Sequence, residues 1–188
     1  PNKGTHAAGI YNRAAFFAPE FINLSVTGSA GPGVWIESGG AIQGQNWTLF
    51  NNSAQGLRVD GSALVVDGMD IHDNNLSAVR VFDGRKVELS NVSTTGNGHQ
   101  ATGPEDGAAM VFIESNDIES NSGDVMCRTC ISREDAWGGV WAQDSVDLWL
   151  DDFDIHDPLN GTAPIVIDNG GLTASYQGGR FQMHDVHV

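Results

Sequence analysis

The sequence predicts an all-β fold, a solenoid of about seven coils that stack as a parallel β-helix. Three observations lead to this prediction. A motif recurs about every 24 residues, apolar residues alternate inside each repeat, and helical signals are almost absent. A repeat of this size cannot bury its own apolar face, so the repeats must stack on one another. A β-sandwich is the alternative, but it does not explain the fixed period.

The first strand of each repeat follows a small residue and reads apolar, any residue, apolar. This period of two places alternate side chains inside and outside a strand. Two longer intervals coincide with polar insertions at residues 95–107 and 133–137. The copies of the motif begin at Gly9, Gly33, Gly56, Ala78, Met110, Gly139 and Pro164.

The second and third strands form two apolar pairs separated by two residues, as in Leu64, Val66, Met69 and Ile71. The separating residues are mostly turn formers, so we expect a sharp corner between the strands. Three strands per coil, stacked about 4.8 Å apart, make a parallel β-helix. The expected corners include Gln45-Asn46, Asp67-Gly68, Ser90-Asn91, Asp151-Asp152 and Gly179-Arg180.

With these motifs, residues 9–186 resemble the right-handed parallel β-helix proteins of the pectin-lyase-like superfamily. That superfamily holds lyases, hydrolases, epimerases, adhesins, phage spikes and structural repeats, so the resemblance implies a fold more than a function. In its enzymes the first sheet lines the polysaccharide groove. In its pectate lyases, calcium carboxylates and an arginine base lie on that sheet.

The outward positions of the first strands predict a ligand-binding stripe. Flat rings stack on the apolar faces of sugars, and arginines pair with carboxylates or sulfates. The same stripe could instead be a contact surface for a partner or a neighbouring chain. The stripe comprises Tyr11, Trp35, Arg58, Arg80, Phe112 and Trp141, followed by Val166.

Several side chains are candidates for metal binding. Glu37, Asp60 and Glu114 stand at the next outward position, where calcium suits clustered carboxylates. A solvated acidic rim that pairs with the arginines is the alternative. His156 and His184 fall on neighbouring predicted coils, so a metal pair is geometrically possible. Copying of the repeat would also explain these histidines.

The resemblance makes Arg80 and Asp83 candidate catalytic residues, because an arginine and carboxylates share the first sheet in pectate lyases. His99 is a third candidate. It lies in the 95–107 insertion, which we expect to hang beside the first sheet, where the groove walls of the resembled enzymes form.

Cys127 and Cys130 both fall at inward positions on either side of a corner. We expect either two buried thiols or a local disulfide across the corner. An extracellular setting favours the disulfide.

Six Asn-x-Ser/Thr sequons are present, and glycans could fit at all of them because they fall at predicted corners or outward positions. The polar composition of β-helix corners is the alternative explanation. The acceptor residues are Asn23, Asn46, Asn51, Asn75, Asn91 and Asn160.

The formal net charge of -15 argues against nucleic acid or an anionic membrane face as a partner. No apolar run approaches the roughly 18 residues of a membrane helix, so we expect no membrane insertion. The 188 residues suit one domain, 1–188. Because no cap follows residues 180–188, we expect a segment of a longer solenoid or a filament-forming subunit that stacks head-to-tail.

Three functions fit these observations. The first is a secreted or cell-surface solenoid with a structural or adhesive role. The second is a polysaccharide lyase, epimerase or hydrolase acting on an acidic glycan. The third is a carbohydrate-binding module without catalysis. Each makes a polysaccharide or cell-surface glycan the expected partner, and calcium is the expected cofactor if there is one.

Overall fold

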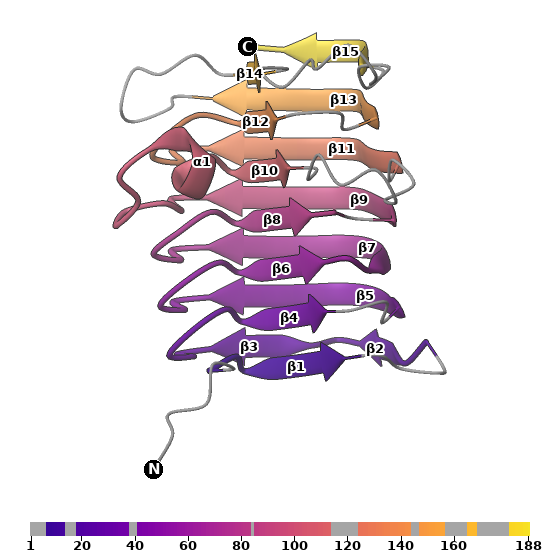
Figure 1. Cartoon of the computed structure of the whole chain (residues 1–188). Coiled ribbons are helices and arrows are strands. Elements are labelled where there is room, and N and C mark those ends of the chain that lie inside the picture. The colour runs from indigo at the N-terminus through magenta and orange to yellow at the C-terminus, as the bar shows by residue number, and fades with distance from the viewer. Residues whose placement is uncertain are drawn as a thin grey trace, which may run out of the picture.

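The computed structural model is a parallel β-helix, as predicted (Figure 1). It describes residues 7–13, 18–37, 41–83, 85–113, 124–143, 147–156, 165–168 and 181–188. Two parallel sheets, called sheet A and sheet B below, run along the stack of coils, and every strand pairs in parallel with the equivalent strand of the next coil.

Among the described residues, sheet A has seven short strands, and sheet B has eight strands that are mostly longer. The strands of sheet A are β1 (Ile10–Arg13), β4 (Val34–Glu37), β6 (Leu57–Asp60), β8 (Val79–Phe82), β10 (Met110–Ile113), β12 (Val140–Gln143) and β14 (Ile165–Asp168). Those of sheet B are β2 (Glu20–Ile22), β3 (Ser25–Thr27), β5 (Ala41–Phe50), β7 (Ala63–His72), β9 (Lys86–Thr95), β11 (Asp124–Arg133), β13 (Asp147–His156) and β15 (Phe181–His187).

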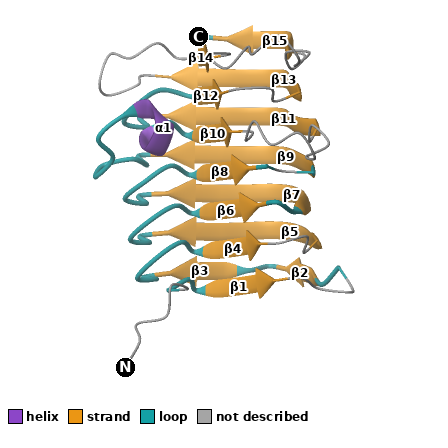
Figure 2. Cartoon of the chain, viewed as in Figure 1, coloured by secondary structure: helices purple, strands orange, loops and turns teal. Residues whose placement is uncertain are grey.

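A short helix, α1 (Pro104–Gly107), lies in the 95–107 insertion on one side of the stack (Figure 2). It contacts β10 of sheet A, so the insertion does lie beside the first sheet, as expected. No helix of the described residues is long and apolar enough to cross a membrane.

The strands of sheet B bend at a single column of residues, which creates the third face of each coil. Every residue in the column has a positive φ, between 49° and 80°. Asparagine, aspartate and glycine tolerate this left-handed conformation best, which explains the turn formers seen in the sequence. The column comprises Asn23, Asn46, Gly68, Asn91, Thr129, Asp152 and Asp185. We call the residues before this corner the first arm of sheet B and those after it the second arm.

Two predicted registers are wrong by a few residues. In β10, Met110 pairs with Val79 and Val140, so Phe112 points inward and is fully buried, and Val111 takes its place in the outward stripe. In β15, the corner is Asp185, because Phe181 pairs with Leu148. The predicted corner at Gly179-Arg180 lies outside the described residues.

Close packing explains why a small residue precedes the sheet A strands. A Cβ on Gly56 would stand 2.4 Å from Ile71 Cγ2, and one on Gly139 would stand 2.6 Å from Ile155 Cδ1. Side chains of the second arm therefore fill the space where sheet A begins. Inside β5, Trp47 fills the space over Gly44 in the same way. These contacts close one continuous apolar core along the axis.

A row of buried asparagines follows sheet B at the turn toward sheet A. Asn74 Nδ2 donates to Asn97 Oδ1 over 2.8 Å and to the carbonyl oxygen of Leu49 over 3.0 Å. Its Oδ1 accepts from the backbone N and the Nδ2 of Asn52. Asn97 repeats the pattern with Asp135 Oδ1. We call Asn52, Asn74, Asn97 and Asp135 the asparagine ladder. It satisfies backbone groups that the turn would otherwise bury without partners.

Cys127 and Cys130 form a disulfide across the corner of β11, with Cα atoms 6.3 Å apart. Both are fully buried in the core, so of the two alternatives the structure has the disulfide. Between them, Thr129 occupies the corner with φ of 52°, which is unfavourable for a β-branched residue.

Asn74→Ala should destabilise the chain by about 3 kcal/mol, because it leaves buried amide and carbonyl groups of neighbouring coils without partners. Urea unfolding followed by circular dichroism measures the change. Asn75→Ala, at a half-buried neighbour, is the matched control and should change stability by less than about 0.5 kcal/mol. Equal effects of the two substitutions would contradict the assigned role of the ladder.

Thr129→Asn should stabilise the oxidised chain by about 1 kcal/mol, because asparagine adopts a positive φ more readily than a β-branched residue. The reciprocal change Asn46→Thr, at the equivalent corner of β5, should destabilise it by a similar amount. Both are read from unfolding midpoints without reductant. A loss of stability in Thr129→Asn would show that the corner does not strain threonine.

Candidate functional site

The predicted stripe on sheet A is in register, apart from Phe112. Tyr11, Trp35, Arg58 and Arg80 stand on successive strands, and Trp141 continues the row beyond Val111. Val111 is fully buried although it occupies an outward position. Because Val111 replaces an aromatic ring and is covered, the stripe is interrupted at β10.

The part of the stripe from Tyr11 to Arg58 is linked from coil to coil by contacts between its side chains. The Tyr11 and Trp35 rings meet edge to face with centroids 5.2 Å apart, and the Arg58 guanidinium lies 4.5 Å from the centre of the Trp35 ring. Trp35 is only 8% exposed as a result. A sugar could not stack on this ring without displacing Arg58.

The carboxylates beside the stripe bind stripe residues. Asp60 Oδ2 accepts from Trp35 Nε1 and from Arg58 Nε, each over 2.7 Å. The Tyr11 hydroxyl donates to Glu37, and this hydrogen bond raises the pKa of Tyr11. The structure thus favours the alternative reading, an acidic rim that pairs with the stripe.

The predicted calcium ligands do not form a cluster in the described part of the chain. No group of three or more acidic, histidine or cysteine side chains could hold a metal there. Glu37 and Asp60 are neighbours in register, but Phe82 follows Asp60, and Ile113 occupies the next position, which was assigned to Glu114. Glu114 itself lies outside the described residues.

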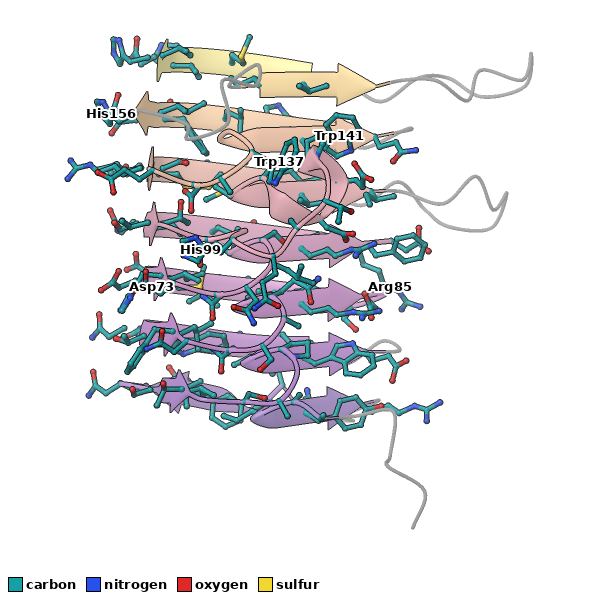
Figure 3. All side chains as sticks on the ribbon, turned by 90° about the vertical axis from the view of Figure 1, so that its left-hand side faces the viewer. Asp73, Arg85, His99, Trp137, Trp141 and His156 are labelled. Atoms are coloured by element: carbon teal, nitrogen blue, oxygen red, sulfur yellow. A yellow bond between two sulfur atoms is a disulfide. The ribbon has the colours of Figure 1, made fainter. Side chains whose placement is uncertain are left out.

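The three catalytic candidates do not come together in one site. Arg80 Nη1 donates to Asp106 Oδ1 of helix α1 over 2.8 Å, so its charge is already paired. Asp83 is the corner residue after β8, with φ of 50°. His99 lies near Asp73 on another side of the coil, with Nε2 3.9 Å from Asp73 Oδ1 (Figure 3).

The proposed pairing of His156 with His184 is wrong. His156 stands in register with Arg133, at the end of the second arm, whereas His184 stands in register with Asp151 before the corner. The shift in β15 causes this error. His184 Nδ1 lies 3.1 Å from Asp151 Oδ1 and 3.2 Å from Asp185 Oδ2.

Three sequon asparagines occupy the corner column, where a positive φ favours asparagine. Asn23, Asn46 and Asn91 are exposed there. Asn46 Nδ2 donates to Asn23 Oδ1, and Asn91 Nδ2 donates to Asp67 Oδ1. Asn51 is exposed at a turn and Asn75 is half-buried, whereas Asn160 lies outside the described residues.

Near α1, two tryptophans stand close together beside the helix (Figure 3). Trp137 Nε1 donates to the carbonyl oxygen of Ala101 over 3.3 Å and so fastens the insertion to the next coil. Trp141 Nε1 is buried and has no hydrogen-bond partner among the residues that the structure describes. The arrangement holds the insertion against the stack, which accounts for the covered position of Val111.

Asp135 is a buried carboxyl group in the described part of the chain. Burial raises its pKa, although hydrogen bonds from Thr94, Asn97 and Ser132 act in the opposite direction. A shifted pKa often marks a functional residue. Here the side chain is only 1% exposed and its oxygens face the asparagine ladder, so its role is structural.

A groove of about 640 Å³ lies on the other sheet, where His184 is the one lining residue that was predicted as a site residue. It crosses β11, β13 and β15, and we call it the sheet B groove. It is lined by Met126, Arg128, Trp149, Leu150, Asp151, Gln182, Met183 and His184. A signal was available, because Trp149 stands between the inward residues Leu148 and Leu150 and must point outward.

A family model described as right handed beta helix region matches residues 7–157. The chain therefore belongs to this family of right-handed β-helix proteins. No curated protein and no solved structure gives a significant match.

Asp135→Asn should make the chain more stable at neutral pH. The folded state holds the Asp135 proton more tightly than the unfolded state does, because burial raises the pKa. The contribution of Asp135 to stability is therefore fully present below the ordinary carboxyl pKa and declines as pH rises toward the raised value. The asparagine amide can donate to the Thr94 and Ser132 hydroxyls instead.

Urea midpoints of the wild type and the variant, compared between acid and neutral pH, test this expectation. The two urea midpoints should be similar in acid. The midpoint of the variant should exceed that of the wild type by a growing margin as the pH rises. Asp70→Asn, an exposed change of the same charge on β7, should show no such divergence. If the urea midpoint of the wild type instead rose relative to that of Asp135→Asn with increasing pH, the raised pKa assigned to Asp135 would be contradicted.

Proposed function

We propose that this chain forms part of a secreted or cell-surface solenoid with a structural or adhesive role. One observation carries the proposal: the side chains on the outer face of sheet A bind one another across coils. Tyr11 bonds to Glu37 and Trp35 to Asp60, each across neighbouring strands, and Arg80 bonds to Asp106 of the insertion. Such contacts stiffen a stack of coils.

The internal features support the same role. The asparagine ladder runs through four turns and ties consecutive coils by hydrogen bonds in a low-dielectric interior, where such bonds are strong. A solenoid is stabilised by contacts between neighbouring repeats. A stack with this many inter-coil bonds suits a rod that must keep its shape outside the cell.

The setting outside the cell rests on two further observations. Disulfides persist mainly in oxidising compartments, and the Cys127–Cys130 disulfide is buried in the core. The exposed sequon residues Asn46 and Asn91 are accessible to glycosylation. An arginine base of the lyase type would need a guanidinium free to meet substrate, whereas Arg80 is paired with Asp106.

Two assays on the purified full chain test the proposal. Incubation with polygalacturonate, alginate and glycosaminoglycans should release no new reducing ends and no unsaturated ends. Beads coated with the chain should be retained on at least one of these polysaccharides when it is immobilised, whereas beads coated with albumin should not. Turnover that disappears in Arg80→Ala would make the protein an enzyme, and absence of retention on every surface would overturn the adhesive role.

A further inference from the structure

Two inward residues flank the corner of each long strand of sheet B and build the core there. In β7 they are Val66 and Met69, and the equivalent pairs of β9 and β13 are also buried and apolar. In β11 the same two positions hold Cys127 and Cys130, which are fully buried and joined by the disulfide. Cysteine is shorter than these apolar residues, so the pair in β11 contributes less apolar burial. A covalent bond takes the place of part of that packing.

The opposite side of the same coil is fitted to the two cysteines. On sheet A, Met110 stands where the neighbouring strands β8 and β12 have Val79 and Val140. Its side chain is fully buried, and its Sδ lies 3.5 Å from Cys127 Sγ. Methionine is long and unbranched, and it fills irregular gaps in cores. It therefore reaches into the space that a short cysteine leaves, and this layer of the core is built around the disulfide.

The corner of β11 also depends on the bond. Thr129 occupies it with φ of 52°, whereas the other residues of the corner column are asparagine, aspartate or glycine. A β-branched residue is unfavourable in this conformation. The disulfide joins the residues on either side of the corner and so holds Thr129 in place. Without the bond, both the small apolar pair and the unfavourable corner weaken this coil.

The position of β11 makes such a weakness important for the whole stack. The strand lies between β9 and β13 in sheet B (Figure 1). The disulfide joins two residues of one strand, so it fixes the shape of its own coil and does not tie one coil to the next. In a solenoid each repeat is stabilised by its own contacts and by those with its neighbours. A weak repeat inside the stack therefore divides it into two blocks.

We propose that the Cys127–Cys130 disulfide is a redox-controlled lock on the coil of β10 and β11. With the bond intact, the stack unfolds as one unit. After reduction by a small dithiol, this coil opens first, while the coils from β4 to β9 stay folded. The asparagine ladder supports those coils, because Asn52, Asn74 and Asn97 bond to one another across their turns. The inference does not depend on the adhesive role proposed above.

The chemical step is an ordinary thiol–disulfide exchange. A thiolate of the dithiol attacks one sulfur and forms a mixed disulfide, which the second thiol of the reductant then resolves. Two electrons and two protons pass to the protein, leaving two cysteine thiols and the disulfide of the reductant. Both sulfur atoms belong to side chains with 0% exposure, so the attack requires the coil to open. The lock is restored when a small disulfide oxidises the two thiols again.

Hydrogen exchange of the full chain, measured by peptide mass spectrometry, tests the proposal. The oxidised chain is compared with the chain reduced by dithiothreitol, and intact mass confirms the two added hydrogens. Amides of β11 should exchange about tenfold faster or more after reduction. Amides of β5 and β7 should change by less than about twofold. Equal acceleration in all three strands, or no acceleration in β11, would overturn the lock.

A substitution at the corner separates the lock from a general loss of stability. In the reduced chain, Thr129→Asn should slow the exchange of β11 about fivefold, because asparagine tolerates the positive φ. Asp152→Asn, at the exposed corner of β13, is the matched control and should change it by less than about twofold. If both variants behave like the reduced wild type, the corner has no part in the lock and this element of the proposal is wrong.

The rate of reduction tests whether the coil must open. Dithiothreitol should reduce the native chain roughly a hundredfold more slowly than the same chain in urea, because the bond is reached only through an opening of the structure. The double variant Cys127→Val with Cys130→Val carries an apolar pair and no bond, so dithiothreitol should leave its exchange unchanged. Equal rates of reduction in the native and the urea-unfolded chain would show that the closed coil does not protect the disulfide, and would overturn the proposal.

Discussion

Buried side-chain amides at the turn from sheet B to sheet A, in three successive coils, hold the described part of this solenoid in register. A turn that passes from sheet B to sheet A exposes amide and carbonyl groups to the core, and unpaired buried groups are costly. Asn52, Asn74 and Asn97 meet those groups and each other. The residue before each of them has a positive φ, which turns the asparagine side chain inward. When the ladder residues of neighbouring coils are in register, the strands on either side of them are in register too. The inward and outward faces of both sheets then follow from this one constraint.

The two sheets use their outward side chains differently. On sheet A, Trp35 and Arg58 contact each other, and both donate hydrogen bonds to Asp60. The outward side chains of this face therefore bind one another. On the first arm of sheet B, Trp149 and Arg128 line a groove. A side chain engaged between coils stabilises the stack, so the outer face of sheet A contributes to the stiffness of the solenoid.

The repeat period and the alternation of apolar residues were enough to predict the β-helix, because both follow from strand geometry and stacking. One error arose where apolar and polar residues do not alternate. Residues 110–113 are apolar throughout, so nothing within them distinguished Phe112 from Val111 as the outward residue. In β15, the apolar pairs Phe181/Met183 and Val186/Val188 flank the corner at Asp185, but the prediction placed the corner at Gly179-Arg180. The pairings Trp35–Asp60 and Arg80–Asp106 join separate coils and depend on side-chain rotamers, which sequence periodicity does not contain. The ladder asparagines were indistinguishable from ordinary turn residues.

The hydrogen bonds of the ladder all point the same way. The backbone N of Ser29 donates to Asn52, Asn52 donates to Asn74, Asn74 to Asn97, and Asn97 to Asp135. The row is therefore a string of aligned dipoles with its positive end at Asp135, much as a helix has a positive N-terminus. An ionised carboxylate accepts hydrogen bonds but cannot donate one, so in that form Asp135 meets the positive end of the row and ends it among the described residues. The two ends of the row therefore differ, because a backbone amide donates at one and a carboxyl group accepts at the other.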